Sequence, residues 1–119
     1  MAYDPARPAR YPENPRVVAR PPHAMRPVAA ADDGRTIFYA CSAPYGTLGS
    51  TIAAYDTAAG RARHARDPLP GQQVRSLVFD RGLKALVFGT TMEADCASCP
   101  PATDRCYIGL MAADTLKVM

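Results

Sequence analysis

Four cysteines are the residues of this chain whose spacing is most suggestive of chemistry. Cys96 and Cys99 form a C-x2-C pair, Cys106 follows after six intervening residues, and Cys41 lies far upstream. Zinc prefers four tetrahedral ligands and often takes two of them from such a pair. The sequence therefore offers these four thiols as a candidate zinc site, and zinc is the only cofactor it suggests. Because a second C-x2-C pair is absent, a disulfide within residues 96–106 and a set of free thiols remain alternatives.

No catalytic residue emerges from the other polar side chains. The two histidines, His23 and His64, have no nucleophile or metal-ligand partner at a characteristic spacing. Tyr45 and Leu48 lie in a glycine-rich loop, where they are expected mainly to pack the loop. Because loop aromatics suit sugars and flat molecules, Tyr45 and Leu48 are also the candidate ligand-binding residues. The corresponding ligand would be a carbohydrate or a protein.

The composition is that of a globular protein, with 48% hydrophobic and 21% charged residues and a net charge of +3. The positive charge comes from arginine, but no basic residues cluster beyond the alternating Arg61–Arg66 stretch, so no nucleic-acid partner is expected. No apolar run approaches the ~20 residues that span a bilayer, so no membrane partner is expected either. The proline-rich and charged N-terminus lacks a signal core, which predicts a cytoplasmic chain by default.

The pattern of short apolar runs and turn residues predicts strands and no helix. Seven of the 12 prolines lie within residues 5–27, which excludes a helix there but allows a short strand at Arg16–Arg20. Further along, β-branched and aromatic runs alternate with Asp-Gly and Gly-rich turns. The expected strands are Val28–Ala31, Thr36–Cys41, Thr51–Tyr55, Arg61–Arg66, Val74–Phe79, Ala85–Gly89 and Cys106–Met111, with Leu116–Met119 beginning another.

The turn markers recur. Asp32-x-Gly34 and Asp80-x-Gly82 lie 48 residues apart, Asp56 and Asp114 lie 58 apart, and Asp4 precedes Asp56 by 52. Each aspartate is expected to accept hydrogen bonds from backbone N–H groups of its own turn. A unit of about 50 residues with four short strands is typical of propeller blades.

Other short motifs share this pattern, and they lie at residues 14–16, 26–28, 33–35, 43–49, 55–56, 73–77 and 89–90. Through them, the chain from Tyr3 to Met119 resembles an internal segment of bacterial WD40, YVTN and quinoprotein-like propellers. The resemblance implies an all-β fold of about two four-stranded antiparallel blades, an incomplete β-propeller. Residues 1–25 would be a proline-rich extended segment with the tail of a preceding blade. Residues 26–70 would form a full blade and residues 71–119 a second, truncated one.

The resemblance also implies a non-enzymatic propeller segment that acts as a scaffold or binding surface within a larger protein. One alternative is part of a carbohydrate-active propeller enzyme, a lyase or hydrolase, and another is a small metal-binding protein built on the cysteine loop. Two blades leave apolar flanks, so the expected partners are the remainder of the propeller or copies of the chain. Val74–Phe79 and Ala85–Gly89 are nearly continuous apolar runs, which predicts burial on both faces.

Overall fold

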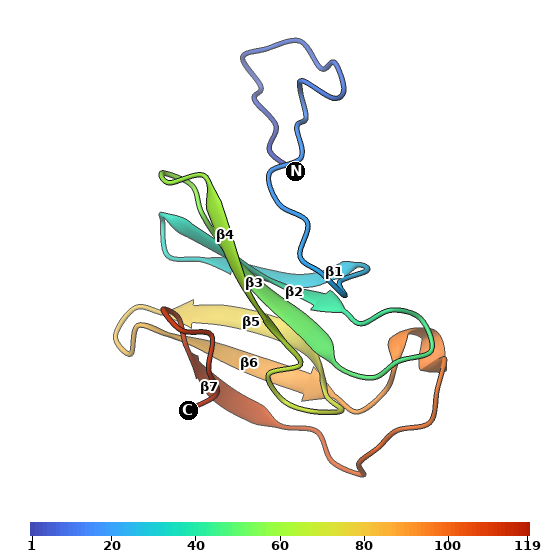
Figure 1. Ribbon diagram of the computed structural model, residues 1–119. Helices are drawn as coiled ribbons and strands as arrows, with labels where there is room; N and C mark the ends of the chain where they lie inside the picture. The colour runs from blue at the N-terminus through green and yellow to red at the C-terminus, as the bar shows by residue number, and fades with distance from the viewer.

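The computed structural model describes all 119 residues and contains seven strands (Figure 1). The strands form where the sequence is richest in β-branched, aromatic and small apolar residues. The first sheet has the order β1-β2-β3-β4 and the second has the order β5-β6-β7, both antiparallel. The strands are β1 (Pro27–Asp32), β2 (Thr36–Ser42), β3 (Ser50–Asp56), β4 (Arg61–Arg66), β5 (Gln73–Asp80), β6 (Ala85–Thr91) and β7 (Ile108–Ala112). The prediction of an all-β chain is confirmed.

The remaining chain contains little regular structure. Its helical element is a single 3-10 turn, η1 (Asp95–Ala97), and no helix is long and apolar enough to cross a membrane. Residues 1–16 form a loop that projects away from the sheets (Figure 1), closed by mutual backbone hydrogen bonds between Ala2 and Arg16 at 2.9 Å. Asn14 fills this loop and is 3% exposed, with its side chain bonded to backbone groups of three residues.

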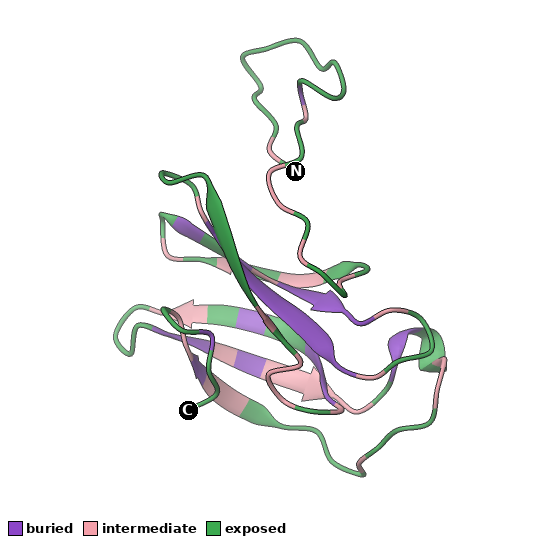
Figure 2. Ribbon diagram, in the orientation of Figure 1, coloured by how far each residue is buried: buried purple, intermediate pink, exposed green.

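The two sheets pack face to face around one apolar core. The first sheet contributes Phe38 and Ile52, and the second contributes Leu86 and Met111, all no more than 1% exposed. The rings of Phe38 and Phe79 stack across the interface with centroids 5.8 Å apart. Figure 2 shows that burial concentrates on β2, β3 and β6, whereas the edge strand β4 is exposed along almost its whole length. The sheets are therefore two layers that share a single hydrophobic core.

A hydrogen-bonded node fastens the layers together at the end where β3 and β5 begin. The buried Ser50 hydroxyl donates to the Gln72 carbonyl at 3.3 Å and accepts from the Val74 N–H at 3.2 Å. The Gln72 side chain, 1% exposed, accepts from the Thr90 hydroxyl and donates to Thr103, at 2.7 Å each. Because buried polar groups are costly without partners, this network fixes the long connection between β6 and β7 against both sheets.

Aspartates hold the turns, as the sequence predicted. The Asp56 carboxylate accepts from the Ala58 and Ala59 N–H groups at 2.9 Å each, and Asp80 accepts from the Leu83 N–H at 2.8 Å. Arg35 from the neighbouring turn donates to Asp56 through Nε at 3.1 Å and Nη2 at 2.8 Å. These hydrogen bonds, that from Arg35 first, lower the pKa of Asp56 to about 2.

Three local expectations need correction. Residues Arg16–Arg20 do not form a strand, because Arg16 pairs only with Ala2 and the flanking prolines leave no partner for the rest. Residues 106–107 precede β7, and Leu116–Met119 form a single bridge, Met111 to Val118, beside β7. The apolar strands of the second sheet are not buried on both faces, since Val78 is 63% exposed.

Replacing Phe38 by Ala is expected to lower the free energy of unfolding by about 3–5 kcal/mol, because the cavity it leaves lies between two rigid sheets. Urea unfolding followed by circular dichroism measures this change. Ile37→Ala is the matched control, since Ile37 points to the opposite face and is 44% exposed. The control should cost about 1 kcal/mol or less, and equal losses for the two variants would contradict the described core.

The lowered pKa of Asp56 gives a pH dependence whose sign is fixed. A carboxylate with a folded pKa of about 2, below its ordinary value of 3.8, stabilises the fold above that ordinary value, and the contribution is lost as pH falls through the folded pKa. Asp56→Asn keeps an acceptor for the turn and removes the titrating charge. The fall in melting temperature on acidification should therefore be shallower in Asp56→Asn than in the natural chain, and identical profiles would rule out this linkage.

Candidate functional site

The loops that follow the second strand of each sheet come together at one end of the molecule. The β2–β3 loop meets the β6–β7 connection where the Gly46 N–H donates to the Ser98 hydroxyl at 2.9 Å. Beside this contact, the Arg26 guanidinium forms an ion pair with Asp95 and lies 3.7 Å from the Cys96 Sγ. Asp95 is 7% exposed, so Arg26 compensates a largely buried charge.

The four cysteines are not gathered at this end. All four are free thiols, and no three His, Cys, Asp or Glu side chains are placed to share a metal ion. Cys41 is 4% exposed, and its side chain lies on the β2 face that also carries Ile37 and Tyr39. That face points away from the loops that hold Cys96 and Cys99, so alternation along β2 is the physical reason why the thiols stay apart. Burial raises the pKa of the Cys41 thiol.

Tyr45 and Leu48 share the β2–β3 loop but do not line a common cavity. Tyr45 is 64% exposed, and its backbone N–H points to the Met25 Sδ at 3.0 Å. Leu48 lines a small depression of about 120 Å³ that also includes His23 and Asp67. There the pKa of Asp67 is raised by burial, and its Oδ1 is buried without a hydrogen-bond partner. The ligand-binding role of Tyr45 and Leu48 stays a prediction.

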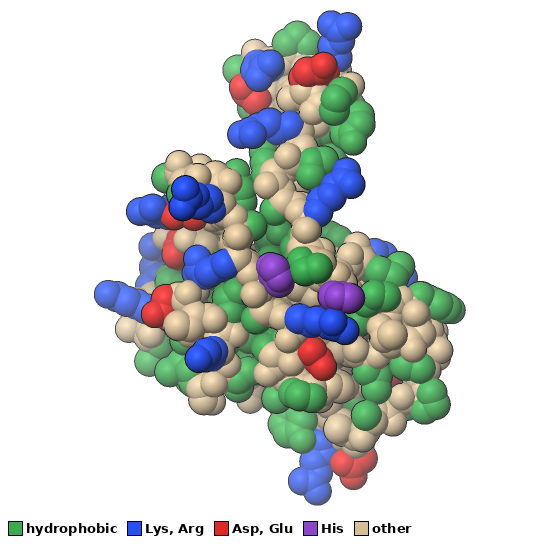
Figure 3. Space-filling model, viewed as in Figure 1, with side chains coloured by type: hydrophobic (Ala, Val, Ile, Leu, Met, Phe, Trp, Pro, Cys, Tyr) green, Lys and Arg blue, Asp and Glu red, His purple; other side chains and the backbone are tan.

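Both histidines lie at the surface of the face seen in Figure 3. His64 is on the exposed edge strand β4, and His23 lies in the segment before β1, where only its carbonyl is engaged, by the Thr51 hydroxyl at 3.5 Å. Neither imidazole takes part in a hydrogen bond or an ion pair of the structure. His23 shares the small depression with Arg66 and Asp67, but no hydrogen bond or ion pair links its imidazole to either side chain.

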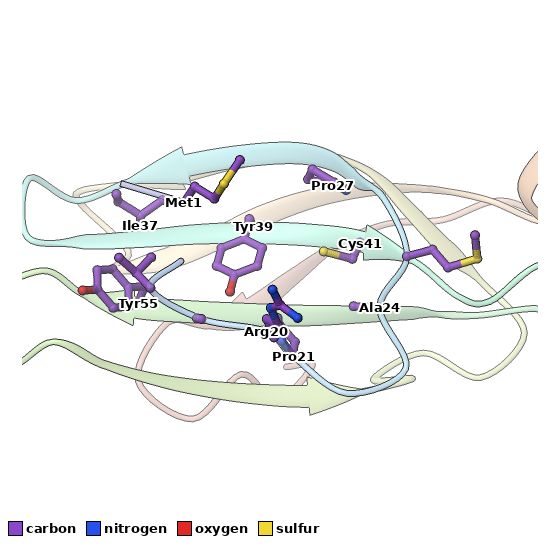
Figure 4. A pocket seen from close by; sticks show the side chains of 12 residues that line it. Met1, Arg20, Pro21, Ala24, Pro27, Ile37, Tyr39, Cys41 and Tyr55 are labelled. Atoms are coloured by element: carbon purple, nitrogen blue, oxygen red, sulfur yellow. The ribbon is translucent and has the colours of Figure 1, made fainter. Parts of the chain in front are cut away.

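An apolar hollow lies on the outer face of the first sheet, where residues 18–27 cross over β2 and β3 (Figure 4). It has a volume of about 440 Å³ and is lined mostly by hydrophobic side chains. Ile37 and Tyr39 of β2 and Tyr55 of β3 form its floor, and Arg20 supplies its only charged side chain. Burial, followed by the nearby Cys41, raises the pKa of Tyr39.

Sequence reasoning missed this hollow, although part of its signal is present. Ile37, Tyr39 and Cys41 alternate with Phe38 and Ala40, so the pattern indicates a strand with two apolar faces. What covers the second face is decided by residues 18–27, which are anchored where the Thr51 hydroxyl donates to the Pro22 carbonyl at 3.3 Å. A proline-rich segment has no periodicity that predicts its course over a distant sheet.

Searches against protein families, curated proteins and solved structures found no match to this chain. The classification of this protein therefore rests on its fold. It is an all-β protein of two stacked antiparallel sheets, with four and three strands.

The exposure of the four cysteines predicts their reactivity toward a thiol-specific disulfide reagent at mildly alkaline pH. Cys96 and Cys106 are exposed and Cys99 is partly exposed, whereas Cys41 is buried with a raised pKa. Because the thiolate is the reactive form, three thiols should react quickly in the native protein and the fourth at least roughly tenfold more slowly. Cys41→Ser should remove only the slow phase. If the slow phase remained in this variant, the slowly reacting thiol would be a cysteine other than Cys41.

Proposed function

We propose that this chain is a non-enzymatic scaffold and binding module, a segment of a propeller-like repeat protein. Its binding site is the apolar hollow on the first sheet, and its ligand is a small, mainly apolar molecule with one acidic group. The observation that carries the proposal is the 440 Å³ volume between residues 18–27 and the β2–β3 face. Ligand pockets of proteins fall in the range of roughly 300–1,000 Å³ and have mostly apolar walls with a few polar groups.

The lining suggests the ligand chemistry. Tyr39 and Tyr55 provide aromatic faces for a flat or aliphatic body, while Arg20 provides a positive charge at the edge. A ligand with a carboxylate or sulfonate can place its charge near Arg20 and its apolar part over the tyrosines. A sugar fits these walls less well, because they offer few hydrogen-bonding side chains to its hydroxyl groups.

Support for a propeller-like segment comes from the order of the strands. The first sheet is a four-stranded antiparallel meander, which is the topology of a propeller blade. In the second sheet, the bridge between Met111 and Val118 puts the C-terminal residues beside β7, in the place of a fourth strand. The first strand of each sheet lies closest to the other sheet, since β1 and β5 are neighbours.

Part of a carbohydrate-active enzyme is the less favoured alternative. Such enzymes need acid side chains free to act on a glycosidic bond. Asp33, Asp56 and Asp80 instead hold the turns in which they lie, and Asp95 is paired with Arg26. These carboxylates therefore serve the fold.

Titration with the fluorescent dye 1-anilinonaphthalene-8-sulfonate tests the site, because this probe combines an aromatic body with one sulfonate. Ala24 lines the hollow, and Ala24→Trp should fill it and weaken dye binding by at least about tenfold. Arg20→Gln should weaken binding by about two- to fivefold, as expected for a partly exposed ion pair.

Arg7→Gln is the matched control, since Arg7 is exposed and lies outside the hollow. It should leave the dye affinity unchanged. Dye affinity that is the same in Ala24→Trp and in the natural chain would show that the hollow is not the binding site, and the proposed function would fail.

A further inference from the structure

The outer face of the second sheet carries an apolar strip that nothing in the chain covers. Val78, Val87 and Leu110 are direct cross-strand partners on β5, β6 and β7, and Ile108 follows on the same face. Val78 is 63% exposed and Ile108 is 87% exposed, while Val87 and Leu110 are half-buried. A contiguous apolar surface of this kind on a folded domain usually marks an interface.

The correspondence between the two sheets shows which kind of surface this is. When the sheets are aligned on the β-bulges of their first strands, Ala29 corresponds to Ser76 and Ala31 to Val78. The cross-strand partners of Phe38 are Ala31 and Ala54, and those of Val87 are Val78 and Leu110. In the first sheet this row of residues packs against the second sheet. The exposed strip is thus the counterpart of a face that is already an inter-sheet contact in this molecule.

The opposite end of the stack is closed by the chain itself. Residues 18–27 cross the outer face of the first sheet, and beneath them Ala53 is fully buried and Tyr55 is 9% exposed. Stacked repeats need a cover at both ends to remain soluble. The first sheet has such a cover in residues 18–27, whereas nothing in this chain covers the strip on the second sheet.

The charge of the strip makes it complementary to itself. Gly89 adds no side chain to this face, and a Cβ at Gly89 would come within 2.6 Å of the Ser76 Oγ. Arg75 and Asp80 lie on β5 on either side of Val78, so a copy with β5 running in the opposite direction places each charge near its opposite. Arg81 and Lys84 do not disturb this match, because they line the groove on the other side of the sheet.

We infer that this strip is the interface of a homodimer, in which Val78, Val87, Leu110 and Ile108 pack against the same residues of a second copy across a two-fold axis. Two-fold interfaces that use one patch on both subunits are the commonest in soluble oligomers. The dimer buries the apolar side chains that the monomer exposes to water. This inference rests on the proposed scaffold role, but it is independent of the ligand hollow on the first sheet.

Sedimentation velocity of the full-length chain over a wide concentration range tests the interface. The natural chain should form dimers, and Val78→Lys should weaken dimerisation by at least about tenfold, because each dimer then carries two lysines in an apolar contact. Ile108→Lys provides a second variant whose position is so exposed that its fold should be unaffected, which circular dichroism checks. Leu83→Lys is the matched control: Leu83 is 61% exposed but lies off the strip, so this variant should dimerise normally.

Three results would overturn the inference. The first is a natural chain that remains monomeric at every concentration, and the second is a dimer that survives both strip variants. The third is a ladder of assemblies larger than dimers, which would mean that the strip binds the first sheet of the next copy. Dye titration of the same samples measures the hollow separately. If the natural chain forms no dimer but binds the dye normally, the proposed interface is refuted and the proposed binding site is not.

Discussion

Phe38 stacks on Phe79 across the space between the two sheets, and the rest of the molecule depends on this contact. Successive side chains of a strand point to opposite faces, so an inward Phe38 requires an outward Ile37 and Tyr39. The same register that builds the core therefore builds the floor of the hollow on the other side of β2. Core and candidate binding site are two consequences of one strand alignment, and neither can shift by a residue without exchanging places with the other.

Most polar side chains with defined partners serve this alignment. Ser50 and Gln72 join the sheets at one end, and Asp56 with Arg35 ties two turns together at the other. Because these groups are engaged in backbone and turn contacts, the surfaces left for recognition are mainly apolar. One is the hollow beneath residues 18–27, and the other is the uncovered strip on the second sheet.

Local chemistry explains why the strands and turns were predictable. β-Branched and aromatic runs favour extended backbone, and Asp-Gly pairs favour turns, whatever the rest of the chain does. The failures were non-local. Arg16–Arg20 has strand-like residues but no partner strand. The hollow was missed because its roof and floor are distant in sequence, and only their contact creates it.

The sequence by itself determined an all-β chain and its turn aspartates. Only the tertiary structure decided which residues of the two sheets correspond. The Asp-x-Gly markers are 48 residues apart, which would match Phe38 with Leu86. The β-bulges of β1 and β5 instead match Ala31 with Val78, and therefore match their cross-strand partners Phe38 and Val87. Because the side-chain period of a strand is two, this shift of one residue turns the corresponding row from the buried face to the exposed one.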